Sequence, residues 1–443
     1  MAKYSLEDIE RIIEQKDIKF IRLQFTDVFG ILKNITVMAN HVQRVLEKGC
    51  MFDGSSIEGF ARIEESDMML VPDIDTFEVF PWSNPTGRTA RFICDVYTTA
   101  GEPYEACPRH ILRRQLERAK KLGFDFNIGP ECEFFLFERD AEGEPTLTTS
   151  DEGGYFDLAP LDTGSGARRD ISLALEEMGY EIEASHHECA PGQHEIDFKY
   201  GNALKMADDV MTFKIVVKRI AMAHNLHATF MPKPLYNVAG SGMHVNMSLR
   251  GESGNAFMDA NDEYGLSKNA YGFMAGVINH ARGLALLTNP TINSYKRLVS
   301  GFEAPCHIAW SAKNRSPLIR VPHAKGSATR IELRNPDPTA NPYLAFAGIL
   351  AAGLEGMAQG LTPPAPVNEN IYCLSDSQRN QQNIRRLPQN MYDATKEFAK
   401  DPLMAEVLGE NAFAKYVAGK EAEWADYSQR VTQWEVDQYL TKY

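Results

Sequence analysis

The sequence predicts an α+β fold in two parts, a small N-terminal domain followed by a larger domain that mixes helices and strands. Segments with helical spacing of apolar residues recur along the chain, and shorter strand-like runs lie between them. Both patterns are interrupted at 101–108, where one Gly, two Pro and two acids occur close together. We therefore place the domains at 1–105 and 106–443. A chain of 443 residues is long enough for a substantial core and for roughly two to three domains of about 150 residues each.

The small domain is predicted to begin with a helix and to continue with strands. The helix is expected at 6–14, where apolar residues have helical spacing, and strands are expected at 21–25, 31–37 and 91–97. The sequence Asp-Val-Phe-Gly at 27–30 is typical of a turn and predicts a hairpin between the first two strands. The stretch 50–85 is rich in Gly, Ser, Asp and Pro, and we expect a long irregular loop there, of the kind that is usually functional or mobile.

The larger domain is predicted to alternate helices with short strands. Helical spacing predicts helices at 111–122, 203–222, 264–287 and 340–359. Strand-like runs predict strands at 127–137, 181–189, 194–200, 228–232, 242–249 and 328–334. The tail, 388–443, is predicted to be helical with a polar outside. No repeat of 20–50 residues is visible, which excludes a solenoid.

Composition excludes several classes of partner. The 46 Lys and Arg against 60 Asp and Glu give a net charge of −14, and no basic stripe exists, so neither nucleic acid nor an anionic membrane is expected to bind. Residues 1–10 carry acids where a signal peptide needs bases. The longest apolar stretch, 343–354, has 12 residues, fewer than the roughly 20 that span a bilayer. The seven widely spaced cysteines form no CxxC pair and indicate neither a disulfide framework nor a zinc knuckle. We expect a cytoplasmic protein.

Acidic and imidazole side chains recur on single faces of the predicted strands. Glu131 and Glu133 share a face because side chains alternate along a strand. The run 185–195 places three His around a Pro-Gly turn, with Glu188 and Glu195 on opposite sides of the turn. The alternative interpretations are a solvent-facing strand side for the first pair and strand capping for the histidines. Buried-looking neighbours of the first pair favour a functional role.

Two later runs add polar groups at strand spacing. His244, Asn246 and Ser248 share a strand face behind a Gly-Ser-Gly approach, which by itself is weak evidence for phosphate binding. The run 330–334 alternates Arg, Glu and Arg on one face with Ile and Leu on the other. A solvated strand face is the alternative interpretation of this last run.

Taken together, these runs predict a site for divalent cations and anions. Five glutamates and one histidine form an oxygen-rich ligand set: Glu131, Glu133, Glu188, Glu195, Glu332 and His244. Such a set suits two Mg²⁺ or Mn²⁺ ions, which commonly bind substrate phosphates. Arginines, whose two-donor fork binds carboxylate or phosphate, gather late in the chain: Arg297, Arg315, Arg320, Arg330 and Arg334. The residues alone predict a divalent-metal-dependent phosphoryl-transfer enzyme that acts on an anionic acid.

Several motifs, in one order over essentially the whole chain, resemble type I glutamine synthetase. They lie at 52–56 (Phe-Asp-Gly-Ser-Ser), 129–134, 187–195, 233–234 with 240–244, 314–316 and 330–334. The short C-terminal region and the run 62–67 resemble the alpha subdivision of low-GC Gram-positive bacteria. The resemblance implies a small beta-grasp-like domain and a large catalytic domain, whose curved antiparallel sheet is flanked by helices and lines a funnel between subunits. It also implies a homo-oligomer of two hexameric rings, a dodecamer.

The activity implied by the resemblance is the ATP-dependent ligation of ammonia to L-glutamate, which gives L-glutamine, ADP and phosphate through γ-glutamyl phosphate. ATP is then a co-substrate, and two or three Mg²⁺ or Mn²⁺ ions are expected per site. One ion would be held by Glu131 or Glu133 with Glu188 and Glu195. The other would be held by Glu131 with His244 and Glu332. Feedback inhibition by glutamine, with Arg62 taking part, and association with nitrogen-responsive transcription factors are further expectations.

The resemblance also assigns roles to single residues. The substrate carboxylates would be held by Arg297 and Arg334, with a backbone contact at Gly240, and the phosphates by Arg315 and Arg320. The nucleotide would lie against Glu183, Tyr200, Asn246, Ser248 and Arg330. Asp53 of a neighbouring subunit would deprotonate ammonium, with Tyr155, Glu188 and Glu303 around that position. Glu303 belongs to the run 300–305, which resembles the flap that keeps water from the acyl phosphate.

Three positions depart from the family pattern. Ala239 stands where Asn is common, and Asn246 stands where some relatives have His. Tyr372 is followed by Cys-Leu-Ser instead of Asp-Leu-Pro, so we expect no adenylylation there. Two alternatives to the primary function are a γ-glutamyl-polyamine or related amide ligase on the same scaffold and a catalytically silent regulatory binding protein. Asp53 is an argument against the first, and the complete ligand set is an argument against the second.

Overall fold

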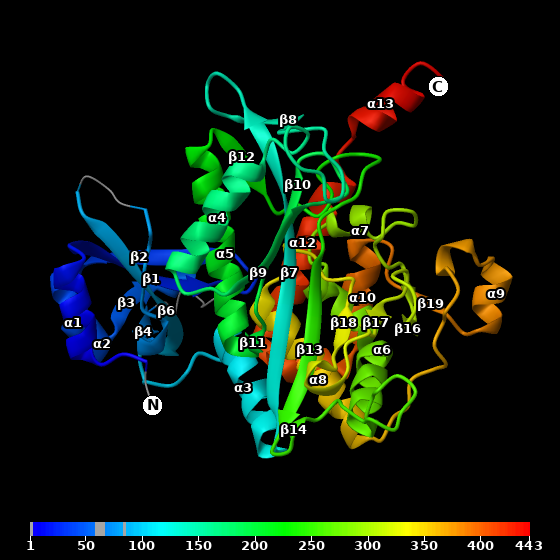
Figure 1. The fold of residues 1–443 in the computed structure, drawn as a ribbon, viewed down its shortest axis with the longest axis horizontal. Coiled ribbons are helices and arrows are strands. Elements are labelled where there is room, and N and C mark those ends of the chain that lie inside the picture. The colour runs from blue at the N-terminus through cyan, green and yellow to red at the C-terminus, as the bar shows by residue number, and fades with distance from the viewer. Residues whose placement is uncertain (1–2, 58–66, 83–85) are drawn as a thin grey trace.

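The computed structural model describes residues 3–57, 67–82 and 86–443. Figure 1 shows a small N-terminal domain, coloured blue, beside a larger body in which long central strands are covered by helices. The predicted α+β class is confirmed. Arg62, to which the family resemblance assigned a part in feedback inhibition, lies outside the described residues.

In its described residues, the small domain is a mixed six-stranded sheet with two α-helices. The helices and strands are α1 (Leu6–Gln15), α2 (Val42–Lys48), β1 (Ile18–Thr26), β2 (Leu32–Met38), β3 (Cys50–Asp53), β4 (Asp67–Pro72), β5 (Glu78–Val79) and β6 (Arg88–Thr98). α1 begins with a capping box between Ser5 and Asp8. β1 and β2 form the expected antiparallel hairpin, and β1 pairs in parallel with the central β6.

The prediction of an irregular loop over 50–85 is wrong for much of its described part. β3, β4 and β5 lie there, and β3 pairs with β4, which pairs with β6. Met68 and Leu70 are buried while Asp67 is exposed and Met69 is half-buried. This two-residue alternation is a strand pattern. It was missed in the sequence because the pattern is short and because turn-forming residues dominate the composition of 50–85.

The larger domain is built on an eleven-stranded sheet in the order β16-β17-β18-β13-β7-β10-β9, with four short strands beside this path. The strands of the path are β7 (Asp125–Arg139), β9 (Ile182–His187), β10 (Gln193–Phe198), β13 (Met243–Gly251), β16 (Trp310–Ser311), β17 (Ile319–Arg320) and β18 (Ile331–Leu333). The four beside it are β8 (Pro145–Thr149), β11 (Gly201–Asn202), β12 (Leu226–Thr229) and β14 (Gly254–Asn255). Within this sheet the described strand pairs are antiparallel except β16 with β17, which is parallel. The six predicted strands are present, although those expected at 228–232 and 328–334 are shorter or shifted.

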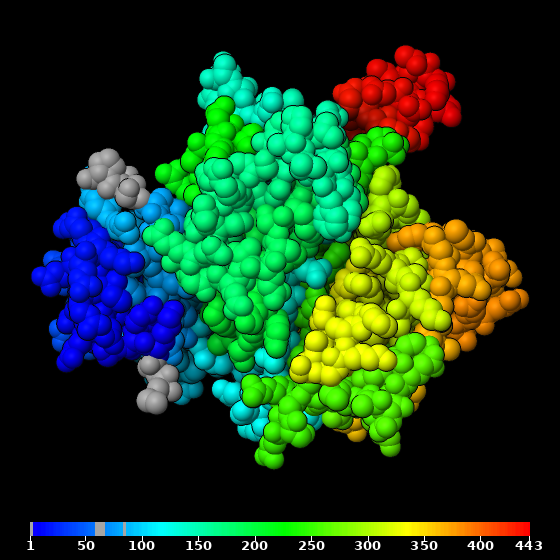
Figure 2. Space-filling view, viewed as in Figure 1, coloured from blue at the N-terminus to red at the C-terminus, as the bar shows by residue number. Residues whose placement is uncertain are grey.

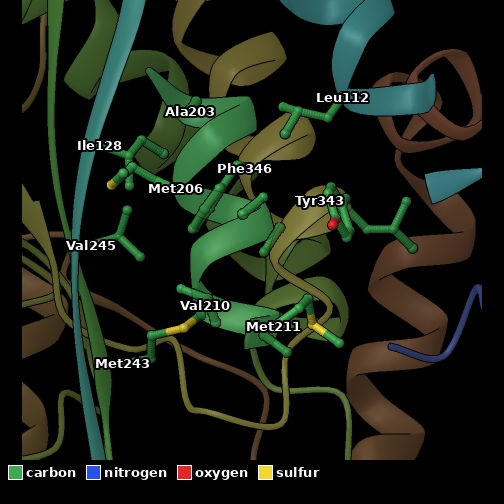
Figure 3. Close-up of a cluster of buried hydrophobic side chains, with 14 of the residues drawn as sticks. Leu112, Ile128, Ala203, Met206, Val210, Met211, Met243, Val245, Tyr343 and Phe346 are labelled. Atoms are coloured by element: carbon green, nitrogen blue, oxygen red, sulfur yellow. The ribbon is translucent and has the colours of Figure 1, made fainter. Parts of the chain in front are cut away.

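Helices cover the sheet and complete the core. They are α3 (Pro108–Lys121), α4 (Ser165–Glu177), α5 (Ala203–Ala223), α6 (Lys268–Thr288), α7 (Ser294–Arg297), α8 (Pro342–Ala358), α9 (Asp376–Gln381), α10 (Met391–Lys400), α11 (Pro402–Leu408), α12 (Glu410–Ser428) and α13 (Gln433–Tyr439). Figure 3 shows how Ile128 and Val245 of the sheet face Val210 of α5 and Phe346 of α8. The predicted helical tail is confirmed, and α13 projects from the body in Figure 1. In the described part of the chain no helix is both long and apolar enough to span a membrane.

A buried arginine joins the two domains. Arg109 of α3 donates to Asp95 of β6 at 3.0 Å, to Asp73 at 2.8 Å and to Asp208 of α5 at 2.9 Å. The Tyr343 hydroxyl of α8 donates to the same Asp208 at 2.7 Å. Because Asp73 and Asp95 belong to the small domain, this cluster fixes that domain against three helices of the larger one, α3, α5 and α8.

His280 of α6 lies between the carboxylates of Glu355 in α8 and of Asp401, the capping residue between α10 and α11. Its ring nitrogens face Asp401, at 2.8 Å, and Glu355. Burial by itself lowers the pKa of His280, but the hydrogen bonds to Asp401 and Glu355 outweigh burial and raise it. The contribution of protonated His280 to the stability of the folded protein is therefore fully present below the ordinary histidine pKa, near 6.5. It is lost as the pH rises through the raised pKa of His280. We expect thermal denaturation midpoints measured from pH 6 to 9 to fall less steeply in His280→Gln; identical slopes would contradict this.

Candidate active site

A polar hollow of about 220 Å³ opens on the large sheet between β7, β9, β10, β13 and β18. In Figure 2 a teal-green part and a yellow part of the larger domain lie beside one another on the face toward the viewer, and residues from both parts of the chain line this hollow. Of the predicted site residues, the following line this hollow: Glu131, Glu133, Tyr155, Glu188, Glu195, Gly240, His244, Arg297, Glu303, Arg315, Arg320, Glu332 and Arg334. The long antiparallel strands thus bring together groups that are about 200 residues apart in sequence.

One possible metal-ligand group consists of Glu131, His244 and Glu332, whose ligand atoms lie within 4.8 Å of one another. β13 lies between β7 and β18, and its register places His244 directly opposite Glu131. The His244 Nδ1 is 3.3 Å from Glu131 and 3.9 Å from Glu332. Burial, followed by the charge of Arg334, lowers the pKa of His244 well below its ordinary value. A neutral imidazole offers a lone pair to a metal.

A second possible metal-ligand group consists of His186, Glu188 and Glu195. His186 is 3.6 Å from each of these glutamates. Glu133 lies nearby and accepts hydrogen bonds from Gln193 at 2.8 Å and from the Gly242 amide at 2.9 Å. Burial, followed by repulsion from Glu188, raises the pKa of Glu133 to about 8. Such crowding of buried carboxylates is relieved by a bound cation, so the donors fit a hard divalent ion.

Sequence reasoning missed His186 as a member of this group. One signal was available in the sequence: His186 and Glu188 are two residues apart, so an extended chain places them on one face. The pairing of His186 with Glu195 in the β9–β10 register is visible only in the structure. Asp197 was missed as well. It lies opposite Glu131 in the β7–β10 register, and burial, followed by repulsion from Glu131, raises its pKa to about 7.

The other two histidines of the run 185–195, His187 and His194, contact buried neighbouring side chains instead of facing the hollow. His187 is fully buried and contacts Asp151 at 2.8 Å. Arg168 contacts His194 at 2.8 Å and Asp162 at 2.7 Å. The four acidic and imidazole groups lie close enough to hold an ion, but the guanidinium already supplies the positive charge there.

Arginines close the other side of the hollow. Glu332 accepts from Arg320 at 2.7 Å and from Arg334 at 2.6 Å, and its side chain is 2% exposed. Arg297 is buried and donates to the Asn335 carbonyl at 2.7 Å. A Cβ at position 242 would lie 2.5 Å from the Arg297 guanidinium, so any larger residue there would displace that guanidinium.

A second hollow, of about 440 Å³, adjoins the first, because Glu131 and Asp197 line both. Five of the seven residues predicted to bind the nucleotide line it: Glu183, Tyr200, Asn246, Ser248 and Arg330. The other two, Arg315 and Arg320, were predicted to contact its phosphates and line the first hollow. Asn246 accepts from Arg330 at 2.9 Å and donates to Glu131 at 2.8 Å. Asn246 therefore links the two hollows directly.

The flap residues 300–305 lie beside the first hollow. Lys233 places its ammonium 3.9 Å from the ring centre of Phe302 and donates to the Val238 carbonyl. Glu303 follows Phe302 with a positive φ of 57°. Lys233 thus connects the loop before Gly240 to the flap.

Asp53 is not brought to either hollow within one chain. It lies at the end of β3 in the small domain and accepts from the Ser55 amide at 2.9 Å and the Ser55 hydroxyl at 2.6 Å. These hydrogen bonds lower the pKa of Asp53, which keeps the carboxylate ionised.

The fold and the site define a metal-dependent enzyme in which a carboxylate-rich centre adjoins a second ligand hollow. Family models agree: one described as the glutamine synthetase catalytic domain matches residues 105–439, and one described as the glutamine synthetase beta-grasp domain matches residues 17–99. The chain belongs to the glutamine synthetase family.

Individual relatives give the same result. A glutamine synthetase from Clostridium saccharobutylicum is 56% identical over 443 residues, 100% of both chains. One from Staphylococcus aureus strain Mu50 is 54% identical over 441 residues, 99% of both chains. A solved GmaS/ADP complex has a TM-score of 0.89 at 34% identity, over 98% of this chain and 99% of that one. The cryo-EM structure of Plasmodium falciparum glutamine synthetase has a TM-score of 0.86 at 26% identity, over 99% and 100%.

Proposed function

We propose that this protein ligates ammonia to L-glutamate with ATP and yields L-glutamine, ADP and phosphate through γ-glutamyl phosphate. The observation that carries the proposal is the junction at Glu131, where a hollow with two metal-ligand groups and several arginines meets a hollow of nucleotide size. The chain's 54–56% identity to proteins named glutamine synthetase supports the same reaction.

The two ligand groups support the binding of two divalent ions, Mg²⁺ or Mn²⁺. Glu131, His244 and Glu332 would hold one ion beside the nucleotide hollow, and Glu133, Glu188 and Glu195 would hold the other, with His186 within reach. Bound there, the ions supply charge neutralisation for the phosphates.

Protein groups then position the substrates. Arg297 and Arg334, with the Gly240 backbone, hold the glutamate carboxylates, while Arg315 and Arg320 neutralise the phosphoryl group during transfer. Glu303 and the flap keep water from the acyl phosphate, and Tyr155 and Glu188 surround the ammonium position.

The reaction is tested by phosphate release. Purified protein with Mn²⁺ or Mg²⁺, ATP and glutamate is expected to release phosphate in proportion to glutamine when ammonia is added. Release that requires a polyamine or another bulky amine would overturn the proposal, and so would glutamine-dependent binding to a regulator without any turnover.

The position of Asp53 supports a homo-oligomer. We place the Asp53 carboxylate in the active site of a neighbouring subunit. The proposed assembly is a dodecamer of two hexameric rings. Each chain contributes two domains, 1–105 and 106–443. Feedback inhibition by glutamine, a cytoplasmic location and association with nitrogen-responsive transcription factors complete the proposal. The mass of the native particle tests the ring count.

Asp53→Ala is expected to reduce synthesis at low ammonium by about 100-fold, because a general base for ammonium is lost while the nucleotide hollow is untouched. Steady-state rates at low and high ammonium measure this effect, and nucleotide affinity is measured by fluorescence titration. Glu47→Ala, which removes an exposed carboxylate of α2 in the same domain, is the control. Unchanged synthesis at low ammonium would contradict the role.

Lys233→Met is expected to raise the KM for glutamate about two- to tenfold, because the variant loses one cation–π contact, the one between Lys233 and Phe302. Ammonia-independent ATP hydrolysis is expected to rise as well, since the flap loses its attachment through Phe302. The variant Lys233→Arg keeps a cation over the ring and should restore both values. A fall in kcat alone, with KM and hydrolysis unchanged, would contradict the positioning role.

A further inference from the structure

A third hollow, of about 370 Å³, lies at the edge of the larger domain opposite the small domain. It forms between α9, β15 (His307–Ile308) and β19 (Arg385–Arg386), where β15 and β19 make a separate two-stranded sheet. Figure 1 shows α9 and β19 in orange at the far side of the molecule from α1. We call this the arginine hollow. Its lining residues are Arg282, His307, Asp376, Arg379, Asn380, Ile384, Arg385 and Arg386. None of them lines the hollows of the candidate active site.

The arginine hollow carries uncompensated positive charge on a chain whose net charge is −14. Its one carboxylate, Asp376, pairs with Arg379 at 2.7 Å and is 93% exposed. Arg282 pairs with Glu397 at 3.1 Å. Among the described residues, no carboxylate forms an ion pair with Arg385 or Arg386, so two guanidinium charges are left without a partner of opposite sign.

A buried histidine, His307, also lines the arginine hollow. His307 is 6% exposed, and its Nδ1 has no hydrogen-bond partner in the described part of the chain. Burial, followed by the charges of Arg379 and Arg386, lowers its pKa to about 4. The neutral ring is therefore surrounded by positive potential, and one of its polar atoms is unsatisfied. A bound anion would reduce that potential.

We propose that the arginine hollow binds a small anion of the polyphosphate class. Guanidinium groups hold phosphate oxygens in a two-donor fork, and two unpaired arginines match an anion with more than one negative charge. The only apolar side chain in the lining is Ile384, so the hollow offers little contact area to an apolar ligand body. A volume of about 370 Å³ is in the range of small-molecule sites.

The hollow also lies next to the flap. The Leu387 amide, directly after β19, donates to the Cys306 carbonyl at 2.9 Å. The Tyr372 hydroxyl donates to the Ala304 carbonyl at 2.6 Å. Leu387 follows β19 directly, and Tyr372 lies in the turn at Ile371–Cys373, before α9. Residues next to two walls of the hollow are thus hydrogen-bonded to Ala304 and Cys306, at the end of the segment 300–305, although the proposed ligand would not enter the active site.

Calorimetric titration of the intact protein with inorganic pyrophosphate, without added metal, ATP or glutamate, tests the proposal. We compare the unmodified protein with Arg386→Ser, whose side chain has no hydrogen bond among the described contacts, and with Arg385→Ser/Arg386→Ser. The matched control is Arg219→Ser/Arg250→Ser, which removes two exposed arginines elsewhere. Circular dichroism confirms that each variant is folded.

The expected result is saturable binding that Arg386→Ser weakens about tenfold and the double variant weakens further, with the control unchanged. Equal weakening in the control would show attraction to overall charge and would overturn the proposal. Absent binding, or binding that survives in the double variant and so belongs to the active-site arginines, would overturn it as well. Because no turnover is measured, these outcomes are independent of the proposed reaction.

Discussion

Glu332→Ala is expected to lower the rate of glutamine synthesis by at least about 100-fold, since even groups that only support a metal ligand change activity by 10- to 100-fold. Glu332 is 2% exposed, belongs to one metal-ligand group and accepts from two arginines. Removing its carboxylate therefore removes a metal ligand and also leaves the guanidinium groups of Arg320 and Arg334 without their acceptor. Buried charges that lose a partner rearrange or destabilise the site.

Mn²⁺ affinity, followed by electron paramagnetic resonance, and the rate of phosphate release measure the effect of Glu332→Ala. Glu332→Gln keeps an oxygen for the arginines but not the charge for the ion, so it should lose metal affinity while retaining a more nearly native thermal stability. Glu181→Ala, which removes an exposed carboxylate that pairs with Lys199, is the control for charge. Wild-type Mn²⁺ affinity in Glu332→Ala would contradict the assignment.

The parts of the fold that the sequence predicted are those with long periodic patterns. β7 and α5 were found because their buried faces repeat with period two or with helical spacing over more than ten residues. β16 and β17 have two residues each, and they are strands only because β16 pairs with β17 and β17 pairs with β18. No local pattern of that length distinguishes a strand from a loop.

The site was predictable where strand alternation fixes a face. Glu131 and Glu133 line the same hollow, and Glu133 is 7% exposed, which excludes the solvent-facing alternative for that residue. His186 was missed because its role depends on the register of β9 with β10, which the sequence does not specify. Asp53 is a different case: residues of one chain place it outside the hollow, so its proposed role depends on assembly.

Arg109→Met is expected to destabilise the protein by about 3–5 kcal/mol, the usual cost of removing one partner from a buried ion pair. Arg109 is 4% exposed and neutralises Asp73, Asp95 and Asp208 across the boundary between the domains. Methionine fills much of the volume but leaves these carboxylates facing one another without their shared cation. Arg113, which reaches Asp73 at 3.4 Å and Asp95 at 3.0 Å, is 35% exposed and compensates only partly.

Guanidinium chloride unfolding followed by tryptophan fluorescence measures this loss, with Arg118→Met as the control. Arg118 lies on the same helix and pairs with Glu406 at 2.9 Å, but both side chains are exposed, so its removal should cost less than about 1 kcal/mol. If the cluster mainly positions the small domain, Arg109→Met should also weaken assembly, because the proposed neighbour contact through Asp53 depends on that domain's orientation. Equal unfolding midpoints for the two variants would show that the buried cluster contributes no more than a surface ion pair.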